Sequence, residues 1–165
     1  MQKVNELFEK DVVAQSSGEK LAKVRDLVFD GEASRLVAML IAGSTPFGGT
    51  QVVRWNMVVS TGDVVVVTGE DLPNLGDEPE VDALHRSGRH ITGTDIVTEE
   101  GEKVGAVGDI FVDDRGVVVG YEVKQGLLSS NKFLPVEKVR SAGKDAIIAI
   151  DADLSSVKDV ENGRG

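Results

Sequence analysis

The chain of 165 residues contains no cysteine. Disulfide bonds and thiol chemistry are therefore excluded, and nothing requires an oxidising compartment. Aromatic residues make up only 4% of the chain, so its cores must rest on valine, isoleucine and leucine. Because the β-branched members of this group favour strands, the composition favours an all-β protein.

Basic residues are also few, since 18 lysines and arginines face 28 aspartates and glutamates and the net charge is −10. A chain of this charge repels a phosphate backbone, so direct binding of nucleic acid is disfavoured. The sequence lacks the run of roughly 20 apolar residues that spans a bilayer, and it lacks the apolar run of a secretory signal. We therefore expect a cytoplasmic protein with no transmembrane segment.

The sequence contains an internal repeat. Residues 18–30, GEKLAKVRDLVFD, return 83 positions later as residues 101–113, GEKVGAVGDIFVD. About half of the paired positions are identical and most of the others exchange one apolar residue for another, which indicates a duplicated unit. We expect two units of roughly 75 to 80 residues each, both with thin cores.

Within each unit, short apolar segments alternate with turns that contain glycine. The expected strands are 12–14, 21–29, 36–41, 52–58 and 64–67 in the first unit, matched by 96–97, 104–112, 117–123, 133–139 and 146–150 in the second. Ile96-Val97 is aligned with Val13-Ala14, and 43–49 and 125–131 are expected to be polar, glycine-rich loops. This pattern, without a long amphipathic helix, predicts a small closed β-barrel in each unit. Such a barrel fills its interior with side chains, so no large ligand cavity is expected.

The expected domain boundaries follow the repeat. Residues 1–69 form the first unit and 88–154 the second. Residues 70–87 are rich in acidic residues, contain proline and glycine, and are predicted to be a linker, with a short helix possible at 80–86. The polar segment 155–165 is predicted to be a flexible tail.

These motifs, in this order, resemble the PRC-barrel family, which is named for the H subunit of the photosynthetic reaction centre and also occurs in a ribosome maturation factor. The resemblance is strongest to small bacterial members with two tandem modules, and it implies two β-barrels used for protein contacts, with no catalytic centre and no cofactor. The second unit fits the pattern better, because Arg54 stands where the pattern expects the proline that Pro135 supplies. The residues that carry the resemblance are Gly18 to Lys20, Val24, Asp26 and Asp30, with Gly101 to Lys103, Val107, Asp109 and Asp113, and the segment Phe133 to Val139.

Four aspartates are weak candidates for a metal site. Asp26 with Asp30, and Asp109 with Asp113, are spaced four apart and would share one face of a strand. Their carboxylates suit Ca²⁺ or Mg²⁺, but the same residues also accept hydrogen bonds in turns. We expect turn hydrogen bonds and no bound metal.

The two histidines, His85 and His90, are a second weak candidate for metal binding. A zinc site would need further ligands from the carboxylates of the predicted linker. We expect solvated histidines instead.

The only aromatic-rich patch is the candidate protein interface. Tryptophan and arginine are favoured anchors in interfaces, and the matched positions of the second unit complete the set. Packing in the core is the alternative role for these residues. The candidate interface comprises Phe47, Arg54, Trp55, Met57, Phe133 and Pro135.

The function that the sequence favours is a non-catalytic adaptor or scaffold that binds an unknown protein partner, with a homodimer as one possibility. One alternative is a ribosome- or RNA-associated assembly factor, by analogy with the maturation factor. Another is a cation-sensing module built on the four aspartates. Enzymatic activity has the least support, because no histidine base lies near Ser16-Ser17 or Ser129-Ser130 within either repeat.

Overall fold

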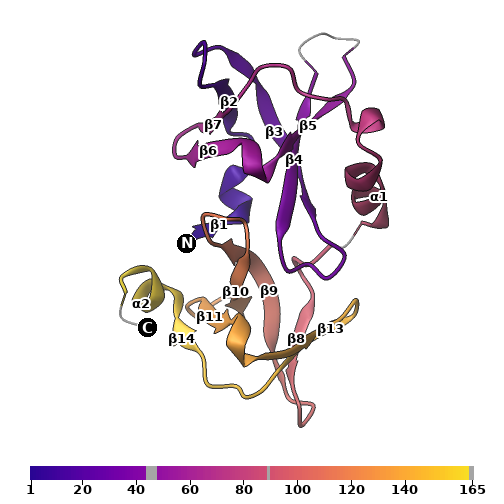
Figure 1. Cartoon of the computed structure of the whole chain (residues 1–165). Coiled ribbons are helices and arrows are strands. Elements are labelled where there is room, and N and C mark those ends of the chain that lie inside the picture. Colours follow the sequence, from indigo (N-terminus) through magenta and orange to yellow (C-terminus); the bar gives the residue numbers. More distant parts are fainter. Residues whose placement is uncertain (44–47, 89, 164–165) are drawn as a thin grey trace. The chain divides into compact units, whose positions relative to one another are not determined.

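The computed structural model describes residues 1–43, 48–88 and 90–163. The chain divides into two compact units, which we describe separately (Figure 1). The N-terminal unit comprises Asn5–Gly88. The C-terminal unit comprises Arg89–Gly165 together with Met1–Val4.

The N-terminal unit is a six-stranded sheet with the order β5-β4-β3-β2-β7-β6. Neighbouring strands are antiparallel, except that β2 and β7 run parallel. The strands are β2 (Asp11–Ala14), β3 (Lys20–Phe29), β4 (Leu36–Ala42), β5 (Thr50–Arg54), β6 (Val58–Thr61) and β7 (Val65–Val67). The short 3-10 helices η1 (Val4–Leu7), η2 (Trp55–Met57) and η3 (Leu75–Asp77) connect strands, and α1 (Pro79–Ser87) ends the unit.

The C-terminal unit repeats this arrangement. Its sheet has the order β12-β13-β8-β9-β10-β11-β14, and β1 (Gln2–Lys3) pairs with β9 off this path. The strands are β8 (Asp95–Thr98), β9 (Lys103–Val112), β10 (Val118–Lys124), β11 (Lys132–Pro135), β12 (Val139–Ala142), β13 (Ala146–Ala149) and β14 (Ser155–Ser156). The 3-10 helix η4 (Val136–Lys138) and the helix α2 (Val157–Glu161) complete it.

Two short strands from the beginning and the end of each repeat pair in parallel, β2 with β7 and β8 with β13. The prediction of two tandem all-β barrels is therefore confirmed. The alignment of the first strands needs a correction of one residue. Asp11 matches Asp95, because the following turn is one residue longer in the N-terminal unit, so Ile96 corresponds to Val12 rather than to Val13.

Branched aliphatic side chains fill both barrels, as the scarcity of aromatic residues requires. Burying each of these side chains contributes about 1.5 to 3 kcal/mol. Fully buried members of the N-terminal core include Val12, Val24, Leu36, Met39, Ile41 and Val53, and those of the C-terminal core include Ile96, Val107, Ile110, Val123, Leu134 and Ile147.

Residues 70–87, predicted to be a linker, instead form part of the N-terminal unit. The helix expected at 80–86 is α1, which begins at Pro79 and ends where Gly88 adopts a left-handed conformation with φ 56°. Its Val81 is fully buried against Val28 of β3 and Val52 of β5. The helix therefore belongs to the core of the barrel, and the prolines and acidic residues before it concealed this in the sequence.

The predicted flexible tail at 155–165 is also structured up to Gly163. Ser155 and Ser156 pair with β11, and α2 then buries Val157 against Phe111 and Phe133. Val157 and Val160 lie three apart and share one helical face, a signal too short to distinguish from chance. Each repeat thus ends in a helix that covers its own barrel.

Candidate functional site

The loop between β10 and β11 presents the most exposed apolar side chains among the described residues. Leu127 and Leu128 have relative exposures of 105% and 103%. They stand at the turn of an antiparallel pair whose last register positions are Val123 and Lys132. A pair of neighbouring leucines exposed to water at the end of a strand pair is a feature of binding surfaces rather than of cores.

We call residues 125–131, between β10 and β11, the leucine loop. The charge around it differs from that of the chain as a whole. No acidic residue occurs from Val123 to Val136, whereas Lys124 and Lys132 are present at the base of the loop. The loop also has a fixed anchor, because Asn131 Nδ2 donates a hydrogen bond to Glu122 Oε1 at 2.9 Å. The glycine and polar residues of 125–131 predict a polar loop here and do not predict an apolar surface, although two adjacent leucines within a loop are a usable signal of one.

The residues of the predicted interface have different surroundings in the structure, and Arg54 contacts its own unit. The Arg54 guanidinium forms an ion pair with Glu78, which directly precedes α1, and it lies 3.9 Å from Glu80. The hydrogen bond to Glu78 raises the pKa of Arg54, and the same bond lowers the pKa of Glu78. Arg54 therefore links β5 to the α1 segment within its own barrel.

The other predicted interface residues have different surroundings. Trp55 and Met57 of η2 are half-buried, as is Pro135 of β11. Phe133 is buried and meets Phe111 edge-on, with ring centroids 5.2 Å apart, so it is a core residue rather than a surface contact. Phe47 lies outside the described residues.

The paired aspartates do not form one site. Asp30 Oδ1 accepts a hydrogen bond from the Ser34 amide at 2.7 Å, and Asp113 Oδ1 accepts one from the Val117 amide at 2.9 Å. These are the turn hydrogen bonds that the sequence led us to expect. Asp26 Oδ2 instead lies 2.9 Å from His85 Nε2 of α1, and Asp109 is buried in β9.

The histidines do not meet each other at a zinc site in the parts of the chain that the structure describes. His85 is engaged by Asp26, whereas His90 is exposed. Within residues 1–43, 48–88 and 90–163, no group of three His, Asp or Glu residues is arranged to hold a metal ion.

A buried acidic group in the C-terminal unit was not found from the sequence. Glu122 of β10 is 5% exposed and lies in register with Asp109 of β9, which is 6% exposed. Lys3 of β1 supplies a positive charge, with its Nζ 2.8 Å from Glu122 Oε2. A local pattern could not reveal this contact, because Lys3 and Glu122 lie 119 positions apart in the sequence.

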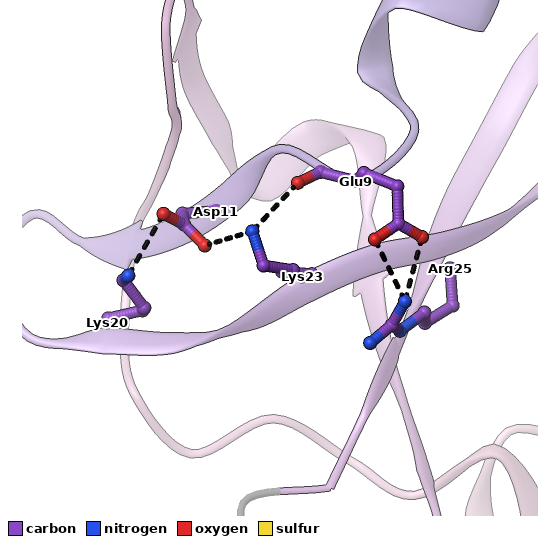
Figure 2. Close-up of polar contacts among 5 residues, drawn as sticks. All are labelled: Glu9, Asp11, Lys20, Lys23 and Arg25. Atoms are coloured by element: carbon purple, nitrogen blue, oxygen red, sulfur yellow. Dashed lines mark hydrogen bonds and ion pairs between the residues drawn. The ribbon is translucent and has the colours of Figure 1, made fainter.

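A row of charged residues crosses β2 and β3 in the N-terminal unit (Figure 2). Asp11 Oδ2 lies 3.0 Å from Lys20 Nζ, and its Oδ1 lies 3.2 Å from Lys23 Nζ. Beyond them, Arg25 Nη1 donates to both carboxylate oxygens of Glu9 at 2.7 and 2.9 Å. The C-terminal unit retains only the first of these pairs, in which Asp95 lies 3.0 Å from Lys103.

None of the helices in the described ranges is long and apolar enough to cross a membrane. A comparison with curated proteins finds no match. The model of the PRC-barrel domain matches the chain twice, at residues 1–72 and 85–155, and these ranges correspond to the two repeats. The chain therefore belongs to the PRC-barrel domain family.

Proposed function

We propose that the protein is a non-catalytic adaptor or scaffold whose C-terminal barrel binds a partner protein through the leucine loop. The observation that carries this proposal is the full exposure of Leu127 and Leu128. Burying both side chains in a partner's pocket contributes about 3 to 6 kcal/mol, which is enough for them to anchor an interface of moderate affinity.

The surroundings of the loop favour a protein partner. A net charge of −10 opposes approach to an anionic membrane or to nucleic acid. The hydrogen bond from Asn131 to Glu122 fixes one end of the loop, which reduces the entropy lost when the loop is bound. A partner pocket with apolar walls and an acidic rim complements the two leucines and the lysines at the base of the loop.

The side chains that could suggest catalysis are engaged in other ways. Asp30 and Asp113 accept turn hydrogen bonds, and His85 pairs with Asp26. The turn hydrogen bonds give Asp30 and Asp113 a structural role, which is compatible with a protein that binds a partner.

The test is site-specific photocrosslinking in cells. A photoreactive amino acid replaces Leu128 in one sample and the exposed Lys144, in the turn before β13, in a control sample. We expect a protein adduct of reproducible mass from position 128 and none from position 144. The adduct should disappear when Leu127→Ser is added and persist when Ser129→Ala is added. Equal adducts at both positions, or none at position 128, would overturn the proposal.

A further inference from the structure

Residues 2 and 3 contact the C-terminal barrel in the way that a bound peptide does. Gln2 and Lys3 pair antiparallel with Val112 and Phe111 at the edge of β9. The Lys3 ammonium lies 2.8 Å from Glu122 Oε2 and 5.6 Å from the centre of the Phe111 ring. Backbone pairing and one selected side chain are together the elements of recognition by strand addition.

The barrel fold does not itself require this arrangement, as the N-terminal unit shows. There Leu40 takes the position of Glu122, since Leu40 is in register with Asp26 and Glu122 with Asp109. Val28 likewise takes the position of Phe111, two residues beyond the aspartate in each unit. The carboxylate and the ring that contact Lys3 are thus both specific to the C-terminal unit.

The strand β1 also has no counterpart among the described residues of the N-terminal unit. Among the residues that the structure describes, the only strands that pair with β3 are β2 and β4, so no equivalent of β1 lies on the matched edge. The N-terminal barrel folds with its six strands and without this addition. The pairing of β1 with β9 is therefore an added feature of one unit.

Glu122 needs a cation. A carboxylate that is 5% exposed and lies opposite Asp109 is costly to keep charged unless a positive group reaches it. Lys3 meets this need, and its hydrogen bond to Glu122 raises the pKa of the lysine and favours its charged form. The site therefore selects a basic side chain at this position of an extended segment.

We propose that Glu122, Phe111 and the adjoining edge of β9 form a binding site for an extended segment of a partner protein that carries lysine or arginine, and that residues 2 and 3 occupy this site in cis. The site shares Glu122 with the anchor of the leucine loop but does not include Leu127 or Leu128, so this inference goes beyond the adaptor function proposed above. A tethered occupant acts at an effective concentration on the order of millimolar, so a partner segment must bind tightly enough to displace it.

The test measures binding of a fluorescent peptide with the sequence of residues 1–7, MQKVNEL, to the full-length chain by anisotropy. In Lys3→Glu the cis segment is repelled by Glu122, so we expect this variant to bind the peptide at least tenfold more tightly than the wild type does. Adding Glu122→Gln should weaken that binding at least tenfold, and a peptide with glutamate in place of lysine should not bind. Lys23→Glu, which breaks a strand ion pair in the other unit, should bind no better than wild type.

A folded Lys3→Glu chain that binds the peptide no more tightly than wild type would overturn the proposal. If that variant does not fold, the wild-type chain serves instead. A millimolar peptide with a photoreactive group in place of its glutamine should then crosslink to Phe111 or Val112, and the glutamate-containing peptide should not. Absence of this crosslink would equally overturn the proposal. Leu127→Ser with Leu128→Ser should leave the binding unchanged, which separates this site from the leucine loop.

Discussion

Gly120 of β10 lies directly beneath the ring of Phe133 on β11, so close that a Cβ atom on Gly120 would stand 2.4 Å from the ring. The N-terminal unit solves the same packing problem differently. Ala38 and Val52 occupy the matched positions there, and both are fully buried. The same space is thus filled by a glycine and a phenylalanine in the C-terminal unit, and by an alanine and a valine in the N-terminal unit.

This relationship predicts that Gly120→Ala destabilises the C-terminal unit by about 1 to 3 kcal/mol, because the added methyl group collides with the Phe133 ring and with the Leu134 carbonyl. The double variant Gly120→Ala with Phe133→Val, which copies the N-terminal pair, should recover part of the loss. Thermal and urea unfolding measure both effects. As a control, Gly62→Ala adds a methyl group with no atom within 4 Å and should change the stability little. Additive losses in the double variant would contradict this account.

Replacing Arg54 with alanine should loosen α1 from the N-terminal barrel. The change removes the ion pair with Glu78, and because both side chains are partly buried we expect a loss of about 1 kcal/mol in the free energy of unfolding. Hydrogen exchange should increase at amides of α1. Arg86→Ala removes an ion pair of a largely exposed arginine on the same helix and is the matched control, with little expected effect. Similar losses from both changes would argue against the special role of Arg54.

The Asp11 carboxyl should titrate below its ordinary value of 3.8, because hydrogen bonds from Lys20 and Lys23 lower its pKa. The aspartate is therefore deprotonated more readily in the folded chain than in the unfolded chain. Its contribution to stability is fully present above pH 3.8 and is lost as the pH falls through the lower, folded value. Carbon-detected NMR titration should show the depressed pKa in wild type and a rise toward 3.8 in Lys20→Met with Lys23→Met. An unchanged titration in the double variant would remove the lysines as the cause.

Val157→Asp should destabilise the C-terminal unit, since it places a charge where an apolar side chain packs against Phe111 and Phe133. A loss of several kcal/mol is expected, on the order of that for an unpaired buried charge. Lys158→Asp, a charge change at the exposed neighbouring position, should cost far less. Equal melting temperatures for the two variants would show that α2 contributes nothing to the core.

The sequence was sufficient for the features that depend on near neighbours. The strands follow from their apolar runs, and the hydrogen bonds of Asp30 and Asp113 follow from turn chemistry a few residues away. The duplication made each repeat a check on the other. That comparison also drew attention to Arg54, although its partner in α1 could not be inferred.

What escaped prediction depends on pairings between distant residues. The burial of Val81 and Val157 requires knowing which barrel surface their helices cover, and neither helix is long enough to show a clear period. In the sequence Glu122 looks like any surface glutamate. Its position beside Asp109 and Lys3 follows only from the pairing of β9 with β10 and with β1. Leu127 and Leu128 can be read from the sequence, but because residues 125–131 were expected to form a polar loop, their role as an exposed apolar pair was not predicted.

The pairing of β1 with β9 also has a consequence for synthesis. The ribosome makes residues 2 and 3 before the N-terminal barrel, whereas their partners Phe111 and Val112 emerge only after that whole barrel. That barrel can close while the segment before it is still unpaired, because β2 and β7, which pair in parallel, are already available. Until β9 is made, a nascent chain therefore carries this lysine-bearing strand without its pairing partner, and completion of β9 is the first point at which β1 can pair.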